Sequence, residues 1–319
     1  MTKPKELNND AYRIINVNTG EIVDSGIFKS YEQLNRERKF AERQANRELQ
    51  KEKNFKEYGD FIWLLYTMNT KYNPDLSPSD TTRLMLVATY MNYDNKLVFE
   101  NNRPITKENI NLLLKISDKE CQRFYKTMIN NNIFYEENNC LYINTKYFYK
   151  GKMGLTPIRY DASTTRLYVN GVRAIYEQAT PRAHKQLGYV FAVLPYVNID
   201  YNMVCTNPKE TNLDSVCYLT LGAFCEIIDY DLHNIRKLIN SFKECISIHD
   251  EYVINFVYNG SYEDMKIYVN PRIYYAGSKW DKVKILGSFS KKSKFIKGHS
   301  TGRPRKKGLP KKYARKADL

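Results

Sequence analysis

One short pattern occurs twice in this chain of 319 residues, and it limits the fold more than any other feature of the sequence. LYINTKYFYKG begins at Leu141 and IYVNPRIYYAG begins at Ile267, and the two segments carry Tyr, Asn, Tyr and Gly at the same four positions. Upstream, Thr106 and Thr220 each open a short apolar helix. Such self-similarity indicates one supersecondary unit used twice. The alternative is a chance match between two aromatic strands.

The two copies are not the same length. The strand pattern recurs after 267 − 141 = 126 residues, whereas the helix opening recurs after 220 − 106 = 114 residues. A longer β-hairpin in the second copy explains the difference, because residues 252–269 read as two strands around Asn-Gly, a pair that favours tight hairpin turns.

The first copy predicts a defined order of elements. We expect a buried helix FIWLLYTMN from Phe61, a helix TTRLMLVATYM capped by Asp80, a short helix ITKENINLLLKI, a helix SDKECQRFYKTMINNNIF with a Ser117–Glu120 capping box, a turn EENN and a strand from Leu141. Helix, helix, turn, helix and hairpin is the order of a winged helix-turn-helix. The second copy predicts helices at 167–177, 182–193, LTLGAFCEIID and YDLHNIRKLINSFKECI, followed by two strands.

The segment before these copies has a different character. Alternating apolar and polar residues around Asn-Thr-Gly predict a β-hairpin at 11–28. Residues 31–58 hold eight Lys/Arg and six Asp/Glu at helical spacing, which predicts a long charged helix. This helix is either a linker or, through a weak apolar seam, a dimerisation arm. The seam would consist of Leu34, Phe40, Ala41, Ala45 and Leu49.

The expected fold class is α+β and mainly helical, with two winged helix-turn-helix modules. The expected boundaries are 1–58 for the hairpin and charged helix, 59–152 for module 1, 153–166 for a connector, 167–289 for module 2 and 290–319 for a disordered basic tail.

The second helix of a helix-turn-helix lies in the major groove of DNA, with one face on the core and the other towards base edges. Both candidate helices divide in this way, and their outward residues are of the types that bind guanine and adenine edges. The first helix places Lys119, Gln122, Arg123, Lys126 and Asn130 outward, and the second places His233, Asn234, Arg236, Lys237 and Asn240 outward. The alternative is an ordinary solvated helix face.

Positive charge is concentrated at the C-terminus. The net charge of the chain is +15, and residues 290–319 carry 12 Lys/Arg and one Asp, hence +11, which leaves +4 for residues 1–289. The tail contains the sequence GRPRKK, in which Arg303, Arg305, Lys306 and Lys307 stand around a Gly-Arg-Pro core similar to an AT-hook. This tail sequence is compatible both with non-specific binding of phosphates and with insertion into an A/T-rich minor groove.

Several classes of function lack their sequence signatures. The chain contains no phosphate-binding G-x-x-x-x-G-K-[ST] loop, no His-x-His pair and no acidic cluster of a two-metal nuclease. We expect no cofactor, no metal and no enzymatic activity. The polar first residues and the lack of an apolar run of about 20 residues predict a cytoplasmic protein, without a membrane partner, associated with nucleoid, plasmid or phage DNA.

The segment ITKENINLLLKISDKECQRFYKTMINNNIFYEENNCLYINTKYFYKG resembles the MarR-like winged helices of small plasmid replication proteins. The two-module layout is similar to that of plasmid and phage replication initiators from low-G+C Gram-positive bacteria. The resemblance implies recognition of origin repeats in duplex DNA, opening of an adjacent A/T-rich segment and recruitment of host replication proteins.

Three alternatives remain open at this level. The chain could be a phage or plasmid transcription regulator that binds an operator as a dimer through residues 31–58. It could be a DNA-processing recombinase or relaxase, or an adaptor whose modules bind protein.

Overall fold

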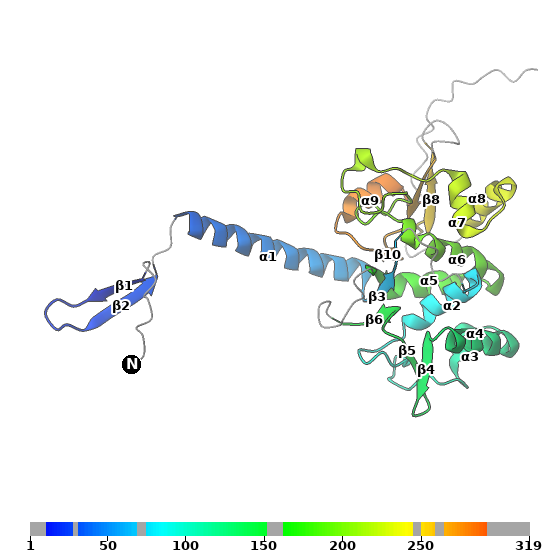
Figure 1. Cartoon of the computed structure of the whole chain (residues 1–319), viewed down its shortest axis with the longest axis horizontal. Helices are drawn as coiled ribbons and strands as arrows, with labels where there is room; N and C mark the ends of the chain where they lie inside the picture. The colour runs from blue at the N-terminus through cyan, green and yellow to red at the C-terminus, as the bar shows by residue number, and fades with distance from the viewer. Residues whose placement is uncertain are drawn as a thin grey trace, which may run out of the picture. The chain divides into compact units, whose positions relative to one another are not determined.

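The computed structural model describes residues 11–27, 31–68, 75–151, 162–244, 250–258 and 265–291. The chain divides into two compact units, with unit 1 ending at Gly59 and unit 2 beginning at Asp60. Figure 1 labels most of the elements of both units. The architecture is α+β, as the sequence predicts.

Unit 1 consists of a hairpin and one long helix. Strands β1 (Ala11–Ile15) and β2 (Ile22–Ile27) pair antiparallel, and the turn between them contains Gly20 with a φ of 70°. Helix α1 (Tyr31–Tyr58) follows and ends where the amide of Gly59 donates to the carbonyl of Phe55. Both sequence predictions for this unit are confirmed for the described residues.

Unit 2 is built on a four-stranded sheet in the order β10-β7-β3-β6. Its central strands, β3 (Phe61–Tyr66) and β7 (Ser163–Tyr168), pair antiparallel over their whole length. The prediction of a helix from Phe61 is therefore wrong. A short apolar run gives no periodicity that would distinguish a buried strand from a buried helix. Residues 163–166, expected in a connector, also belong to this sheet.

The two halves of unit 2 share one order of elements, except that the second half has an additional helix, α5, before α6. The first half continues from β3 with α2 (Pro78–Ala88), α3 (Ile110–Leu114), α4 (Asp118–Asn130), β4 (Phe134–Glu137), β5 (Cys140–Ile143) and β6 (Phe148–Tyr149). The second continues from β7 with α5 (Val169–Gln178), α6 (His184–Ala192), α7 (Leu221–Ile228), α8 (Ile235–Glu244), β8 (Ile254–Val257), β9 (Lys266–Val269) and β10 (Tyr274–Tyr275). Short 3₁₀ turns occupy 181–183, 194–196, 213–215 and 232–234, and α9 (Trp280–Gly287) closes unit 2.

Each repeated sequence pattern forms two strands rather than one. In the first copy β5 pairs with β4, and after a turn β6 joins β3 in the central sheet. In the second copy β9 pairs with β8, and β10 joins β7. The single strand expected from Leu141 is therefore interrupted, since Asn144 and Asn270 both begin turns by accepting a hydrogen bond from the amide two residues later.

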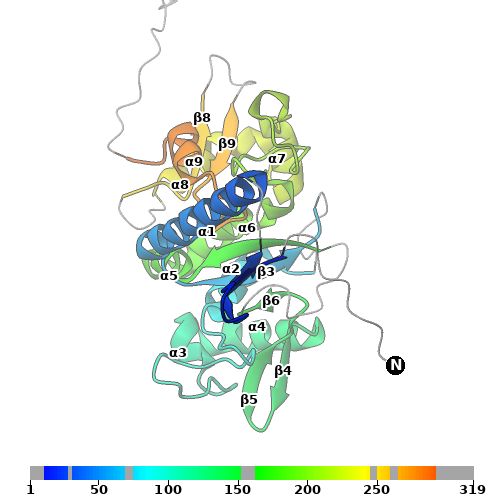
Figure 2. The same ribbon diagram turned by 90° about the vertical axis from the view of Figure 1, so that its left-hand side faces the viewer.

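Matching backbone hydrogen bonds hold a third extended segment against each hairpin. The amide of Leu97 donates to Leu141, and that of Val204 donates to Ile267, over 2.8 and 2.9 Å. The turns before these segments place Asn95 and Asn202 in the left-handed region, with φ of 61° and 51°. The halves therefore share their hydrogen-bond pattern as well as their order. Figure 2 shows the two hairpins at opposite ends of unit 2.

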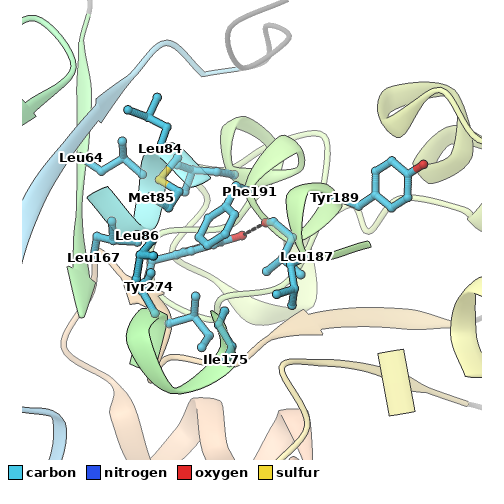
Figure 3. Packing of buried hydrophobic residues seen from close by; sticks show 14 of the residues in the cluster. Leu64, Leu84, Met85, Leu86, Leu167, Ile175, Leu187, Tyr189, Phe191 and Tyr274 are labelled. Atoms are coloured by element: carbon cyan, nitrogen blue, oxygen red, sulfur yellow. Dashed lines mark hydrogen bonds between the residues drawn. The ribbon is translucent and has the colours of Figure 1, made fainter. Parts of the chain in front are cut away.

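The core lies where the two halves meet. Helices α2 and α6 pack closely because Gly188 has no side chain, and a Cβ there would lie 2.0 Å from the carbonyl oxygen of Pro78. Figure 3 shows the buried apolar side chains around this contact, with the Tyr274 hydroxyl donating to the carbonyl of Val190 over 2.7 Å. The core residues labelled there come from both halves: Leu64, Leu84, Met85, Leu86, Leu167, Ile175, Leu187, Tyr189, Phe191 and Tyr274.

Candidate nucleic-acid interface

Helix α4 has one buried face and one exposed face, as its sequence pattern predicts. It begins at Ser117, whose hydroxyl accepts a hydrogen bond from the amide of Glu120. Cys121, Phe124 and Met128 are buried beneath it. The side chains nominated for DNA contact are exposed: Lys119, Gln122, Arg123, Lys126 and Asn130.

Helix α8 is divided in the same manner. Asp231 caps a 3₁₀ turn that leads into the helix, and Ile235, Leu238 and Phe242 are buried. The nominated residues His233, Asn234, Arg236, Lys237 and Asn240 are exposed. The apolar positions predict Leu232 on the inner side with Ile235, Leu238, Ile239 and Phe242, and for Leu232 this prediction is wrong: it is 48% exposed in the 3₁₀ turn, where the periodicity of an α-helix does not apply.

The two helices are held by equivalent turns. Lys115 follows α3 with a φ of 50°, and Asp229 follows α7 with a φ of 52°. The left-handed residue reverses the chain so that α4 crosses α3 and α8 crosses α7. In Figure 1 the α3–α4 and α7–α8 pairs lie on the same side of unit 2, with α2 and α6 between them.

A buried charge network fixes α4 to α2. Ser77, rather than the expected Asp80, caps α2, and its hydroxyl donates to the Asp80 carboxylate over 2.7 Å. Arg123 forms a bidentate pair with that carboxylate, with nitrogen–oxygen distances of 2.7 and 2.8 Å. Arg83, only 2% exposed, lies between Asp80 and Glu120 at 3.3 Å from each.

Asp80 is held ionised by this network. Burial raises the pKa of the Asp80 carboxyl, but hydrogen bonds from Arg123 and Ser77 and the charges of Arg123 and Arg83 outweigh burial, so its pKa lies below the ordinary value. Glu120 was expected to complete a capping box and instead pairs with Arg83.

Arg123 consequently differs from its neighbours on α4. Its side chain is 51% exposed, yet both ends of its guanidinium fork are engaged by Asp80. A guanidinium must present that fork to bind a guanine edge bidentately. Sequence reasoning missed the partner because Asp80 is 43 residues away in the chain. In the 3₁₀ turn before α8, the side-chain amide of Asn234 similarly donates to the Asp231 carboxylate.

The hairpin beside α4 is acidic. Strands β4 and β5 are joined by Asn138 and Asn139, both with positive φ, and the exposed Glu136 and Glu137 precede this turn. The Tyr125 hydroxyl donates to Glu136 over 2.9 Å. Carboxylates repel phosphates, so the helices rather than this hairpin tip form the cationic part of the surface.

The tail residues Arg303, Arg305, Lys306 and Lys307 lie outside the described residues. Within the described ranges, no group of three or more His, Cys, Asp or Glu side chains is arranged to hold a metal ion. No helix in the described part of the chain has the length and apolar character needed to cross a membrane.

Comparisons with protein-family models, with curated proteins and with solved structures found no match to this chain.

Proposed function

We propose that this protein binds double-stranded DNA sequence-specifically, with α4 and α8 as its reading helices, and that it is a plasmid or phage replication initiator. In this proposal each half of unit 2 is a winged helix-turn-helix: α3 and α4 form the motif in one half, α7 and α8 in the other, and the hairpins are the wings. The proposed role is binding without catalysis.

One observation carries the proposal: the two equivalent helices lie on the same side of unit 2, and each exposes cationic and amide side chains. A duplex has its major groove open at regular intervals along one side, and an α-helix fits that groove. Lys119, Gln122 and Lys126 on α4, and Lys237 and Asn240 on α8, have the donors and acceptors that read base edges.

The partner in this proposal is duplex DNA with an A/T-rich segment, together with host replication proteins, and the protein resides in the cytoplasm on plasmid or phage DNA. The basic tail adds sequence-independent affinity through phosphate contacts. Association of two copies through residues 31–58 remains a prediction.

The proposal is tested by selecting bound duplexes from a random pool and measuring affinity for the enriched sequence against random DNA. The double change Lys237→Ala and Asn240→Ala should lower the ratio of the affinity for the enriched sequence to that for random DNA roughly 10-fold or more, since each lost base contact costs about 1–3 kcal/mol. The matched control is Lys209→Ala with Gln178→Ala, an exposed lysine and an exposed amide outside both helices. Failure to enrich any sequence would contradict the proposal.

A transcription regulator is the second candidate function, and the same surface would serve it. The two roles are separated by placing the gene and its flanking DNA on a plasmid that lacks any other origin. An initiator maintains that plasmid, and the Lys237→Ala/Asn240→Ala variant loses it. Specific binding without plasmid maintenance would instead identify a regulator.

A further inference from the structure

Helix α1 carries a row of four positive charges spaced four residues apart. Lys39, Arg43, Arg47 and Lys51 follow one another at i, i+4 intervals within Tyr31–Tyr58. Residues with this spacing share one side of an α-helix. Lys39 and Arg43 are exposed. We call these four positions the cationic ladder.

The glutamates of α1 are placed away from the ladder. Between Arg36 and Asn54 the acidic residues are Glu37, Glu42, Glu48 and Glu52, and none of them stands four residues from a ladder position, although Glu42 and Glu48 flank the two ends of the ladder. The helix does form i, i+4 ion pairs elsewhere: Arg36 with Glu32 at 3.5 Å and Arg38 with Glu42 at 3.3 Å. At their i±4 positions the ladder residues have only another ladder cation, Asn35 or Phe55.

The i, i+4 pairs within the ladder are mutually repulsive. Like charges at i, i+4 cost about 0.2–0.5 kcal/mol per pair, and the ladder contains three successive pairs of this kind. A helix that needed only to remain soluble would intersperse its glutamates, as α1 does at Glu32 and Glu42. A bound polyanion would remove the repulsion.

We propose that the cationic ladder of α1 binds the phosphate backbone of duplex DNA, as a contact separate from α4, α8 and the tail. From Lys39 to Lys51 the helix rises about 18 Å at 1.5 Å per residue, a length that spans several successive phosphates. This inference rests on the proposed function only in taking DNA as the polyanion.

The opposite side of α1 argues against a lipid surface as the ligand. The exposed apolar residues form no single face: Leu34 and Leu49 lie on that side with Glu48 and Glu52, whereas Phe40 and Phe55 fall on or beside the ladder side. An interfacial helix needs an apolar face free of carboxylates to enter the headgroup region. Phosphates of nucleic acid require no such insertion.

The test uses the full chain and two variants of equal charge. The ladder variant carries Lys39→Gln, Arg43→Gln and Arg47→Gln, and the control carries Arg38→Gln, Lys53→Gln and Lys56→Gln on the other side of α1. Affinity for a random-sequence duplex is measured over a range of salt concentrations. The slope of log K against log salt should fall by about 2–3 in the ladder variant, at about 0.9 per lost phosphate contact, and remain unchanged in the control.

Equal loss in both variants would mean that net charge alone matters, and no loss in either would mean that α1 does not contact DNA; both results overturn the inference. Loss of binding to anionic phospholipid vesicles, with DNA binding intact, would also overturn it. Circular dichroism of both variants verifies that α1 remains helical. The outcome is distinguishable from that of the proposed function, because the ladder variant should keep its discrimination between enriched and random sequences, whereas Lys237→Ala/Asn240→Ala should lose it.

Discussion

Trp63 and Arg166 lie directly opposite each other in the antiparallel pair of β3 and β7. The Trp63 indole Nε1 donates to the carbonyl of Gly151 over 3.0 Å, and the Arg166 guanidinium donates to the carbonyl of Gly277. These two glycines close the two copies of the repeated pattern. Two chemically unlike side chains at equivalent positions of the two halves therefore donate a hydrogen bond to the carbonyl of equivalent glycines.

This relationship locates an internal two-fold axis. Trp63 pairs with Tyr149 at one edge of the sheet, and Arg166 pairs with Tyr275 at the other. Exchanging the halves converts each of these pairs into the other and returns the Trp63–Arg166 pair to itself. Helices α2 and α6, and likewise α4 and α8, are exchanged by the same operation.

The axis predicts the symmetry of the DNA site in the proposed function. Two reading helices related by a two-fold axis meet the duplex in opposite orientations, so one copy of the chain should read two inverted half-sites about one helical turn apart. The half-sites should differ in sequence because α4 and α8 expose different side chains. Footprinting should show that Lys119→Ala/Gln122→Ala weakens protection of one half and Lys237→Ala/Asn240→Ala that of the other. Directly repeated halves within one footprint would contradict the prediction.

The contact between α2 and α6 predicts a strong effect of a single methyl group. Gly188→Ala should destabilise unit 2 by about 2 kcal/mol or more, since the new Cβ would lie 2.0 Å from the Pro78 carbonyl oxygen and force the helices apart. Gly222→Ala is the control: its Cβ would meet only the Thr220 hydroxyl at 3.9 Å, so the change should be neutral or slightly stabilising. Thermal unfolding measures both. Equal melting temperatures would show that α2 and α6 tolerate separation.

The charge network at α4 predicts unequal effects of two carboxylate changes. Asp80→Asn removes the charge facing Arg123 and the 2% exposed Arg83, and should lower the free energy of unfolding by about 3–5 kcal/mol. Glu100→Gln removes the partner of Arg173, but this glutamate is 80% exposed, so the loss should stay within about 1 kcal/mol. Urea unfolding compares them. If the two losses were alike, the Asp80 network would not be what holds α4 to α2.

His184 predicts a loss of stability in mild acid. Its side chain is 1% exposed and stacks on Tyr176 with ring centroids 4.4 Å apart. Burial, followed by the charge of Arg83, lowers the pKa of His184 to about 4 from an ordinary value near 6.5. Between these two values the unfolded chain binds a proton that the folded chain does not.

The free energy of unfolding should therefore fall as the pH falls from about 6.5 to 4, by about 3 kcal/mol in total from His184. The variant His184→Phe keeps an aromatic ring against Tyr176 and removes the proton site. Its unfolding free energy should fall much less in this window, because only carboxyl groups such as Asp80 then titrate, towards the lower end. Parallel pH curves for the variant and the original chain would show that His184 is not the responsible group.

Patterns that repeat along the chain were predictable from local physics. The amphipathic division of α4 and α8 follows from their 3.6-residue periodicity, and the outward residues named from that period are exposed. The doubled unit was visible in the strand pattern and in Thr220, whose hydroxyl caps α7 by accepting a hydrogen bond from the amide of Ala223. Residues 61–66 were misassigned because six consecutive apolar residues show no period at all.

The sequence determined which side chains α4 and α8 expose, because side-chain direction within a helix depends only on its own repeat. Only the tertiary structure decided that Arg123 is paired with Asp80, that Trp63 lies opposite Arg166, and that α4 and α8 lie on one side of unit 2. Those relationships join residues far apart in the chain. Their energies depend on burial and on paired partners, which appear once β3 and β7 bring the two halves together.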